Sequence, residues 1–436
     1  MVNQMKNLGL FKPTITFSIV TFGWVVWGTI RLAAADDLPH RGKELVYAAR
    51  EGKYDAVADI LRTHPGSVNA QLPQPWMGVD SQYSRWSSLH WGVERDDIAL
   101  VDLLLRHGAD PNLKDETNEF PLLLVKSREI ATRLIEAGAD VNAVGQLDHT
   151  PLNCSRSAAI AEVLVRHGAK IENHLPLHRA AERNRADVAQ FLIEQGAPVN
   201  ARGYDKRTPL FSACTNGNLF LAKLLIAKGA DIHAKNRDGE TPVWMTTGDY
   251  LRGDIFETTQ VEVMRLLVKQ GASLQGTNKR NETLLHQAAA NGYLEVSRFL
   301  LDSGLDVNAQ NEDNKTPLHW AAGVFREGRY FTSDGSREIA LVELLIERGA
   351  DVNAEASATL LDQWTSKDHV TPKVLTPLWM ALREDDGSDL TSDLTFAQRP
   401  LTAKKSDMYA NQLRNIETIN QTRQKIAAIL REYGAK

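Results

Sequence analysis

Apolar residues recur along most of the chain at the three- and four-residue spacing that places them on one face of a helix. Leu221, Leu224 and Leu225 give one example. A Thr-Pro pair precedes many of these stretches, and a Gly follows them. Thr is favoured at a helix N-cap, Pro in the first helical turn and Gly at a left-handed C-cap. The pattern therefore predicts short helices, arranged in pairs, with defined first and last residues.

These helix signals return at a fixed period. The interval from Thr208 to Thr241 is 33 residues, and so is the interval from Thr283 to Thr316. Self-similarity at such a period is the signature of stacked repeats. We count ten repeats, which start near residues 43, 87, 120, 150, 175, 208, 241, 283, 316 and 376. The repeats near 120 and 150 are three residues short, which predicts one trimmed helical turn in each.

This pattern resembles the ankyrin repeat, whose period is 33 residues and whose signature is Thr-Pro-Leu-His-x-Ala. The signature is complete from Thr316 to His319, and the small pair Ala321-Ala322 follows it. The resemblance covers nearly everything from Gly42 to Lys436. It implies an all-α solenoid of about ten helix-turn-helix repeats with short β-hairpin-like fingers, forming one ankyrin-repeat domain over residues 36–436.

Five stretches are longer than the repeat requires. They lie near residues 72–86, 246–260, 323–338, 355–375 and 383–412. We expect the first and fourth to lengthen fingers between repeats, and the others to lengthen the turns between paired helices. Insertions of this kind map to loops, often on the binding face.

The first 35 residues differ in character from the repeats. Lys6 and Lys12 precede an uncharged run that extends to residue 30, and Ala33-Ala34-Ala35 follows Arg31. A basic start, an apolar run and a small-residue site predict a secretory signal peptide, cleaved after Ala35. The alternative is an uncleaved membrane anchor, although the apolar run is short of the roughly 20 residues that a spanning helix needs. Either interpretation places the remaining chain outside the cytoplasm, in the periplasm or as a secreted protein.

The net charge bears on the kind of partner, and the cysteine positions bear on whether a disulfide can form. The formal net charge of -5 disfavours nucleic acid as a partner, because such binding needs a basic surface. Cys154 and Cys214 occupy first helices two repeats apart, roughly 20 Å by helix packing distances. A disulfide needs α-carbons closer than about 7 Å, so both thiols are expected to be free.

The recurring histidines suggest a metal site, but the spacing between repeats is too large for them to bind one ion together. His90, His178, His286 and His319 occupy the signature position. Neighbouring repeats stack roughly 8–10 Å apart, whereas a metal–nitrogen bond is about 2 Å long. We therefore expect these rings to form hydrogen bonds between turns. The sequence also lacks the common zinc-protease, serine-hydrolase, phosphate-loop and Cys-x-x-Cys motifs, so we predict no catalysis, cofactor or metal. A catalytic role for the 383–412 insertion is the remaining enzyme alternative.

Finger tips and inserted loops are the places where a partner is expected. In the ankyrin family, the finger-tip positions vary and contact partners, and aromatic and Arg residues dominate interface hot spots. The alternatives are that charged tips are merely solvated and that inserted aromatic residues form small cores of their own. The candidate protein-binding residues are Tyr204, Arg207, Arg237, Arg280, Lys315, Tyr330 and Trp364.

The resulting hypothesis is a non-enzymatic scaffold in the periplasm or cell envelope that holds a partner protein on its concave face and fingers. Two alternatives stay open. One is an inhibitor or immunity-type binder that neutralises a toxin or enzyme, and the other is an assembly factor anchored in the membrane by the N-terminal segment. The identity of the partner does not follow from the fold.

Overall fold

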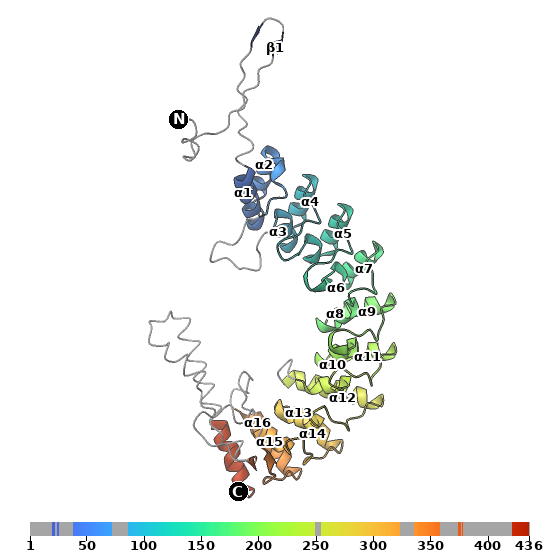
Figure 1. Ribbon diagram of the computed structural model, residues 1–436, viewed down its shortest axis with the longest axis vertical. Helices are drawn as coiled ribbons and strands as arrows, with labels where there is room; N and C mark the ends of the chain where they lie inside the picture. Colours follow the sequence, from blue (N-terminus) through green and yellow to red (C-terminus); the bar gives the residue numbers. More distant parts are fainter. Residues whose placement is uncertain are drawn as a thin grey trace, which may run out of the picture. The chain divides into compact units, whose positions relative to one another are not determined.

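Helices dominate the described part of the chain (Figure 1). The computed structural model describes residues 20–21, 24–25, 38–71, 86–248, 254–322, 335–357, 374–375, 377 and 421–435. The described chain divides into two compact units, residues 1–170 and 171–436. The expected cleavage site after Ala35 and the 383–412 insertion lie outside the described residues. Among the described helices, none has both the length and the apolar character needed to cross a bilayer.

The first unit consists of paired helices and short 3₁₀ segments. The pairs are α1 (Leu38–Glu51) with α2 (Tyr54–Thr63), α3 (Ser88–Glu94) with α4 (Ile98–Arg106), η3 (Pro121–Leu123) with α5 (Arg128–Glu136), and α6 (Pro151–Cys154) with α7 (Ala158–Arg166). The segments η1 (Pro65–Ser67) and η4 (Gln146–Asp148) lie in connections, and β1 (Val20–Thr21) pairs with β2 (Trp24–Val25). The shortened first elements η3 and α6 confirm the trimmed turn expected in the repeats near 120 and 150.

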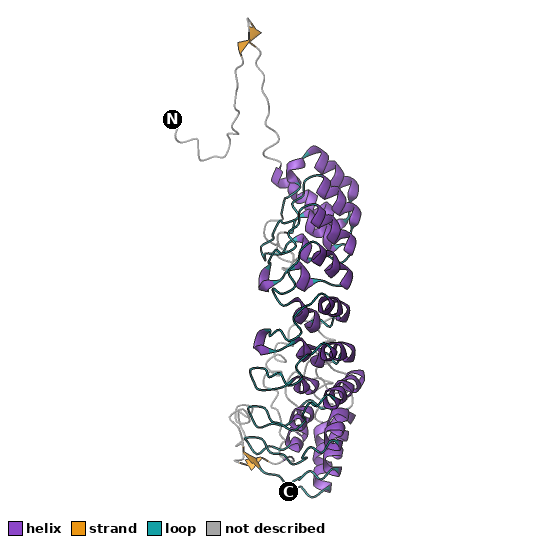
Figure 2. Ribbon diagram, turned by 90° about the vertical axis from the view of Figure 1, so that its right-hand side faces the viewer, coloured by secondary structure: helices purple, strands orange, loops and turns teal. Residues whose placement is uncertain are grey.

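The second unit continues the same pattern. Its pairs are α8 (Pro176–Glu182) with α9 (Ala186–Glu194), α10 (Pro209–Thr215) with α11 (Leu219–Ala227), η6 (Pro242–Thr247) with α12 (Asp254–Lys269), α13 (Leu284–Ala290) with α14 (Leu294–Asp302), and α15 (Pro317–Ala322) with α16 (Ser336–Glu347). A finger segment η5 (Tyr204–Lys206), the short antiparallel pair β3 (Ala356–Ser357) with β4 (Val374–Leu375), and a helix over 421–432 complete it. Figure 2 shows loops projecting from one side of these helices. The predicted all-α repeat architecture is confirmed.

The core of the second unit lies between successive repeats. First helices contact first helices, as α8 does α10 and α13 does α15, and second helices stack likewise from α12 through α14 to α16. Leu210, Leu285 and Leu318 from the signature positions are completely buried. Burying one such side chain contributes about 1.5–3 kcal/mol. Because these contacts join different repeats, one repeat alone would expose most of its apolar face.

Two of the signature histidines, His286 and His90, form the hydrogen bonds between turns that were expected of them. Nδ1 of His286 accepts the backbone N–H of Thr283 at 3.1 Å, and Nε2 lies 2.9 Å from the carbonyl oxygen of Lys315, in the finger that leads into the next repeat. His90 repeats this arrangement with Ser87 and Glu119. Burial lowers the pKa of His90 to about 4 and also lowers the pKa of His286, so both rings are neutral near pH 7. Nδ1 then accepts and Nε2 donates, which fits both contacts.

A second connection between repeats comes from the Asn of the Val-Asn-Ala sequence and its variants. The amide of Asn200 donates to the carbonyl oxygen of Gly229 at 2.9 Å, and its oxygen accepts the backbone N–H of Asp231 at 2.8 Å. Each bond spans from one repeat to the capping Gly of the next. The same amide bridge is made by Asn69, Asn112, Asn142 and Asn308. The bridge satisfies a helix-terminal carbonyl group that the helix itself leaves unpaired.

One expectation needs correction. Residues 254–260, expected to belong to a lengthened turn, instead extend helix α12, because their apolar and charged residues continue its helical pattern. Trp86, at the end of the inserted stretch near residues 72–86, is only 3% exposed, and its indole N–H donates to Asp115 at 3.2 Å. Neither Cys154 nor Cys214 forms a disulfide, as expected, and burial raises the pKa of the Cys214 thiol.

The amide bridge yields a first prediction. Replacing Asn200 with Ala removes both bonds to the next repeat and should cost about 1–2 kcal/mol locally. Hydrogen exchange should accelerate at the Asp231 amide, which loses its acceptor. Gln195→Ala, a change at an exposed neighbouring side chain, serves as the control and should leave that exchange rate unaltered. Equal exchange in both variants would contradict a stabilising role for the bridge.

Glu257 yields a second prediction, on the pH dependence of stability. Burial raises the pKa of this carboxyl to about 7, although Arg337 at 3.2 Å and the Glu295 N–H at 2.9 Å favour the ionised form. The folded chain therefore binds more protons than the unfolded chain between about pH 4.5 and pH 7, and stability falls as pH rises through that range. Glu257→Gln should remove this loss, which is on the order of 2 kcal/mol.

Urea unfolding at about pH 5 and about pH 8 measures the effect. The free energy of unfolding of Glu257→Gln, relative to that of the wild type, should be greater at about pH 8 than at about pH 5. Glu262→Gln, on the exposed side of the same helix, should retain the wild-type pH dependence. The assignment to Glu257 is wrong if both variants behave alike.

Candidate protein-binding surface

Four turns of the second unit form what we term the finger row: residues 203–207, 236–240, 278–282 and 311–315. Three of them share one local mechanism. The side-chain oxygen of Asn236 accepts the backbone N–H groups of Asp238 and Glu240, each at 2.9 Å. Asn278 and Asn311 do the same in their fingers. The fourth position is Gly239, Asn281 or Asn314 with positive φ, a conformation that Gly and Asn adopt most readily.

The 203–207 finger is built differently. Its backbone closes through the Gly203 N–H, which donates to the Arg207 carbonyl at 2.9 Å, and Asp205 and Lys206 both have φ near +60°. Gly203 lies against the ring of His178. A Cβ at Gly203 would come within 2.6 Å of the His178 Nε2 atom, so the close approach requires Gly. This contact seats the finger directly on helix α8.

Neighbouring fingers are joined at their tips. The Arg237 N–H donates to the Asp205 carbonyl at 3.1 Å, Lys279 pairs with Asp238 at 2.8 Å, and the Glu312 N–H donates to the Arg280 carbonyl at 3.1 Å. These links make the finger row a connected surface rather than a set of independent loops.

The predicted contact residues fall into different environments. Tyr204 is 86% exposed, and the Arg237 guanidinium lies 5.5 Å from its ring centroid. Arg280 is exposed at the next tip, whereas Arg207 is half-buried. Lys315, in contrast, is not an exposed tip: this residue is 4% exposed, and its ammonium group lies 5.7 Å from the Trp320 ring, so its contact with a partner stays an untested prediction. The last residue of this finger turns back toward the helices. Tyr330 and Trp364 lie outside the described residues.

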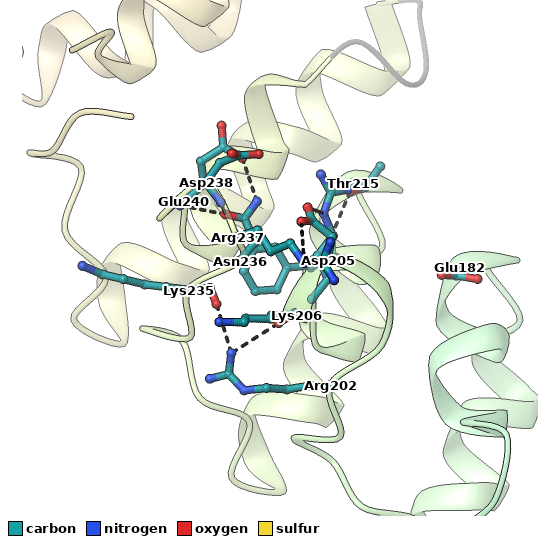
Figure 3. Close-up of polar contacts among 12 residues, drawn as sticks. Glu182, Arg202, Asp205, Lys206, Thr215, Lys235, Asn236, Arg237, Asp238 and Glu240 are labelled. Carbon is teal, nitrogen blue, oxygen red and sulfur yellow. Dashed lines mark hydrogen bonds and ion pairs between the residues drawn. The ribbon is translucent and has the colours of Figure 1, made fainter. Parts of the chain in front are cut away.

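Asp205 is a charged member of the row that the sequence did not single out. Its carboxylate lies 3.5 Å from Nε of Arg207 and 3.9 Å from Nε of Arg237. Arg202 also ties two fingers together by donating to the carbonyl oxygens of Lys206 and Lys235 (Figure 3). The acid between two arginines holds both side chains near one tip. No pattern in the sequence signalled this, because the three residues come from two repeats.

A pocket of about 360 Å³ lies below the 203–207 finger. His178 and Glu182 of α8 line it on one side, and the finger residues Tyr204, Asp205 and Arg207 line it together with Ser212, Thr215 and Asn216 of α10. Among the described residues, no group of three or more His, Cys, Asp or Glu side chains is placed to hold a metal ion.

The pocket lies between two successive repeats that each keep only one residue of the signature Thr–His pair. The repeat near 175 has His178 but Leu175 in place of the N-cap Thr, and the ring's Nδ1 is buried without a hydrogen-bond partner. The next repeat has Thr208 but Phe211 in place of His, and the buried Thr208 hydroxyl is likewise unpartnered. These two departures from the signature were visible in the sequence. We had expected His178 to be structural like the other histidines.

His178 differs from the other signature histidines in its surroundings. Its Nε2 lies 3.5 Å from a Glu182 carboxylate oxygen. Burial lowers the pKa of His178, Glu182 opposes that effect, and Arg179 and Arg207 add to it. The ring is therefore neutral near pH 7, and its contact with Glu182 joins a neutral donor to a carboxylate.

Comparison with known proteins agrees with the geometry. The family profile described as "Ankyrin repeats (3 copies)" matches residues 89–203, 157–236 and 255–356, which together make up more than half of the chain. A stretch of 96 residues is 32% identical to the B-cell lymphoma 3 protein homolog of Mus musculus. It covers 22% of this chain and 19% of the mouse protein, so the chain spans about a fifth of that relative's length. The paired helices, capped signatures and bridged fingers, together with the profile match, show that this chain belongs to the ankyrin-repeat family.

Proposed function

We propose that this chain is a non-enzymatic scaffold of the periplasm or cell envelope that holds a partner protein on the finger row. Ankyrin repeats are interaction modules, and stacked repeats present extended binding surfaces. The observation that carries the proposal is the connected row of exposed tips. Tyr204, Arg237 and Arg280 stand on it as large side chains of the types that dominate interface hot spots.

The structure of the row favours a protein over a small ligand. Its tips carry charges of both signs, such as Lys279 and Asp238, spread over successive repeats. A partner that binds such a surface must extend over several repeats and carry opposite charges at the matching positions, as a protein can. The links between tips also reduce the entropy that the row would lose on binding.

The location rests on the N-terminal sequence. Lys6, Lys12, the uncharged run and Ala33-Ala34-Ala35 have the order of a secretory signal. Removal after Ala35 would leave residues 36–436 in the periplasm or envelope. Retention of the segment would instead favour the anchored assembly factor.

The finger row yields a third prediction. Replacing Lys206, Arg237 and Arg280 together by Ala should weaken partner binding by more than about 2 kcal/mol, roughly thirtyfold. All three side chains are exposed, so the fold should be preserved. The partner is first identified by cross-linking and mass spectrometry of envelope fractions, and its affinity for each purified variant is then measured.

The matched control replaces Lys223, Lys228 and Lys269 by Ala. These are exposed lysines on or beside the second helices α11 and α12. The control should bind with wild-type affinity. A partner lost with the control variant but retained by the finger-row variant would place binding on the second helices and overturn the proposal.

The N-terminal segment yields a fourth prediction. The protein isolated from cells should begin at Asp36 and should leave the membrane fraction without detergent. N-terminal sequencing of the isolated protein tests this directly. An intact Met1 in the membrane fraction would refute cleavage and support the anchored alternative.

A further inference from the structure

The pocket below the 203–207 finger presents several hydrogen-bond acceptors beside the donor groups of Arg207. Glu182 and Asp205 contribute carboxylates, which only accept when ionised. On α10, the Thr215 hydroxyl already donates to the Phe211 carbonyl at 3.0 Å, and the Asn216 amide already donates to the Ala181 carbonyl at 2.9 Å. Their oxygens are therefore what these two side chains offer to a ligand.

The charge of the lining also favours a cation. Arg207 is the fixed positive charge in the lining; its Nε lies 3.5 Å from an Asp205 carboxylate oxygen but is buried without a hydrogen-bond partner. His178 adds no positive charge near pH 7, because burial lowers its pKa. Glu182, on the neighbouring helix α8, retains an oxygen that faces His178 at 3.5 Å, while its other oxygen pairs with Arg179. The acceptors of the lining come from three elements: Glu182 from α8, Asp205 from the finger and Thr215 from α10, and Figure 3 shows Glu182 apart from the other two.

Tyr204 adds an aromatic surface at the rim. Its ring is already contacted by a guanidinium, that of Arg237 at 5.5 Å, and the side chain is nevertheless 86% exposed. An aromatic face that accepts one guanidinium and remains open to solvent is suited to a second one by cation–π attraction.

We propose that this pocket binds an arginine side chain of the partner protein, with the guanidinium donating to Glu182 and to the α10 oxygens while it stacks on Tyr204. The inference rests on the proposed scaffold function and specifies the partner's chemistry. Arginine fits best because its planar guanidinium carries five N–H donors and can stack, whereas lysine presents a compact charge without a flat face. A partner carboxylate could pair with Arg207, but it would also meet the two carboxylates of Glu182 and Asp205, which carry like charge.

The test uses the full chain and a defined probe. Saturation-transfer difference NMR is recorded with N-acetyl-arginine methylamide at millimolar concentration, because a single residue binds weakly. The citrulline analogue has nearly the same shape without the charge, and the lysine analogue has the charge without the plane. We expect saturation of the arginine side chain, with roughly fivefold to tenfold weaker binding of the other two probes.

Variants assign the binding to the pocket. Glu182→Gln should weaken arginine binding by a similar factor, and Tyr204→Ala, a change at an exposed residue that the fold does not need, should weaken it as well. Glu194→Gln, at an exposed acid of the same repeat, is the control and should bind as wild type does. Equal binding of arginine and citrulline probes, or arginine binding that neither pocket variant alters, would overturn the inference.

The outcome is separable from that of the scaffold proposal. If no arginine probe binds while the partner is captured and lost with the finger-row variant, the arginine site is wrong and the scaffold stands. If arginine binds as expected but no partner depends on the finger row, the scaffold proposal fails and the pocket chemistry stands.

Discussion

Burial between neighbouring repeats is the interaction on which the rest of this protein depends. Each helix pair is too small to enclose its own apolar face, and residues such as Leu285 and Leu318 are buried only because another repeat covers them. Two polar connections accompany this stacking: the histidine that joins one N-cap to the next finger, and the asparagine that joins one loop to the next capping glycine. Both pair backbone groups that would otherwise lie unsatisfied at the ends of short helices. Stability and the spacing of the fingers therefore come from the same contacts.

The regular spacing of the finger row results from that stacking of repeats. Three of the four turns are fixed by an Asn oxygen that accepts two backbone N–H groups, and the 203–207 turn is fixed by its backbone hydrogen bond, so the tips can link to one another. A surface held in this way is pre-organised, which lowers the entropic cost of binding a partner. The exposed side chains on the row can then vary without disturbing the repeats that carry them, which is why ankyrin repeats serve as interaction surfaces.

The pocket arises where the repeat signature is broken in two successive repeats. Leu175 cannot cap α8 with a side-chain oxygen, so His178 loses the partner that fixes its ring elsewhere and faces Glu182 instead. Phe211 in the next repeat supplies no imidazole to the Thr208 hydroxyl. A departure from the framework in this place removes hydrogen bonds that stabilise the other repeats, and it leaves a pocket lined by charged and polar residues together with Tyr204. The lost framework hydrogen bonds, which lower stability, and the proposed arginine pocket are therefore at the same site.

The sequence by itself determined the helix pairs, their period, the trimmed repeats and the turn positions, because caps, glycines and apolar spacing act over a few neighbouring residues. It also identified Tyr204, Arg237 and Arg280 as exposed tips. Only the tertiary structure showed that Lys315 folds back onto Trp320, that Asp205 holds two arginines, and that residues 254–260 lengthen a helix. Residues 254–260 continue a helical pattern that is local in the sequence, whereas the first two features depend on side chains from different repeats. The pocket is of the same kind: its residues lie on two helices and a finger, and stacking brings them together.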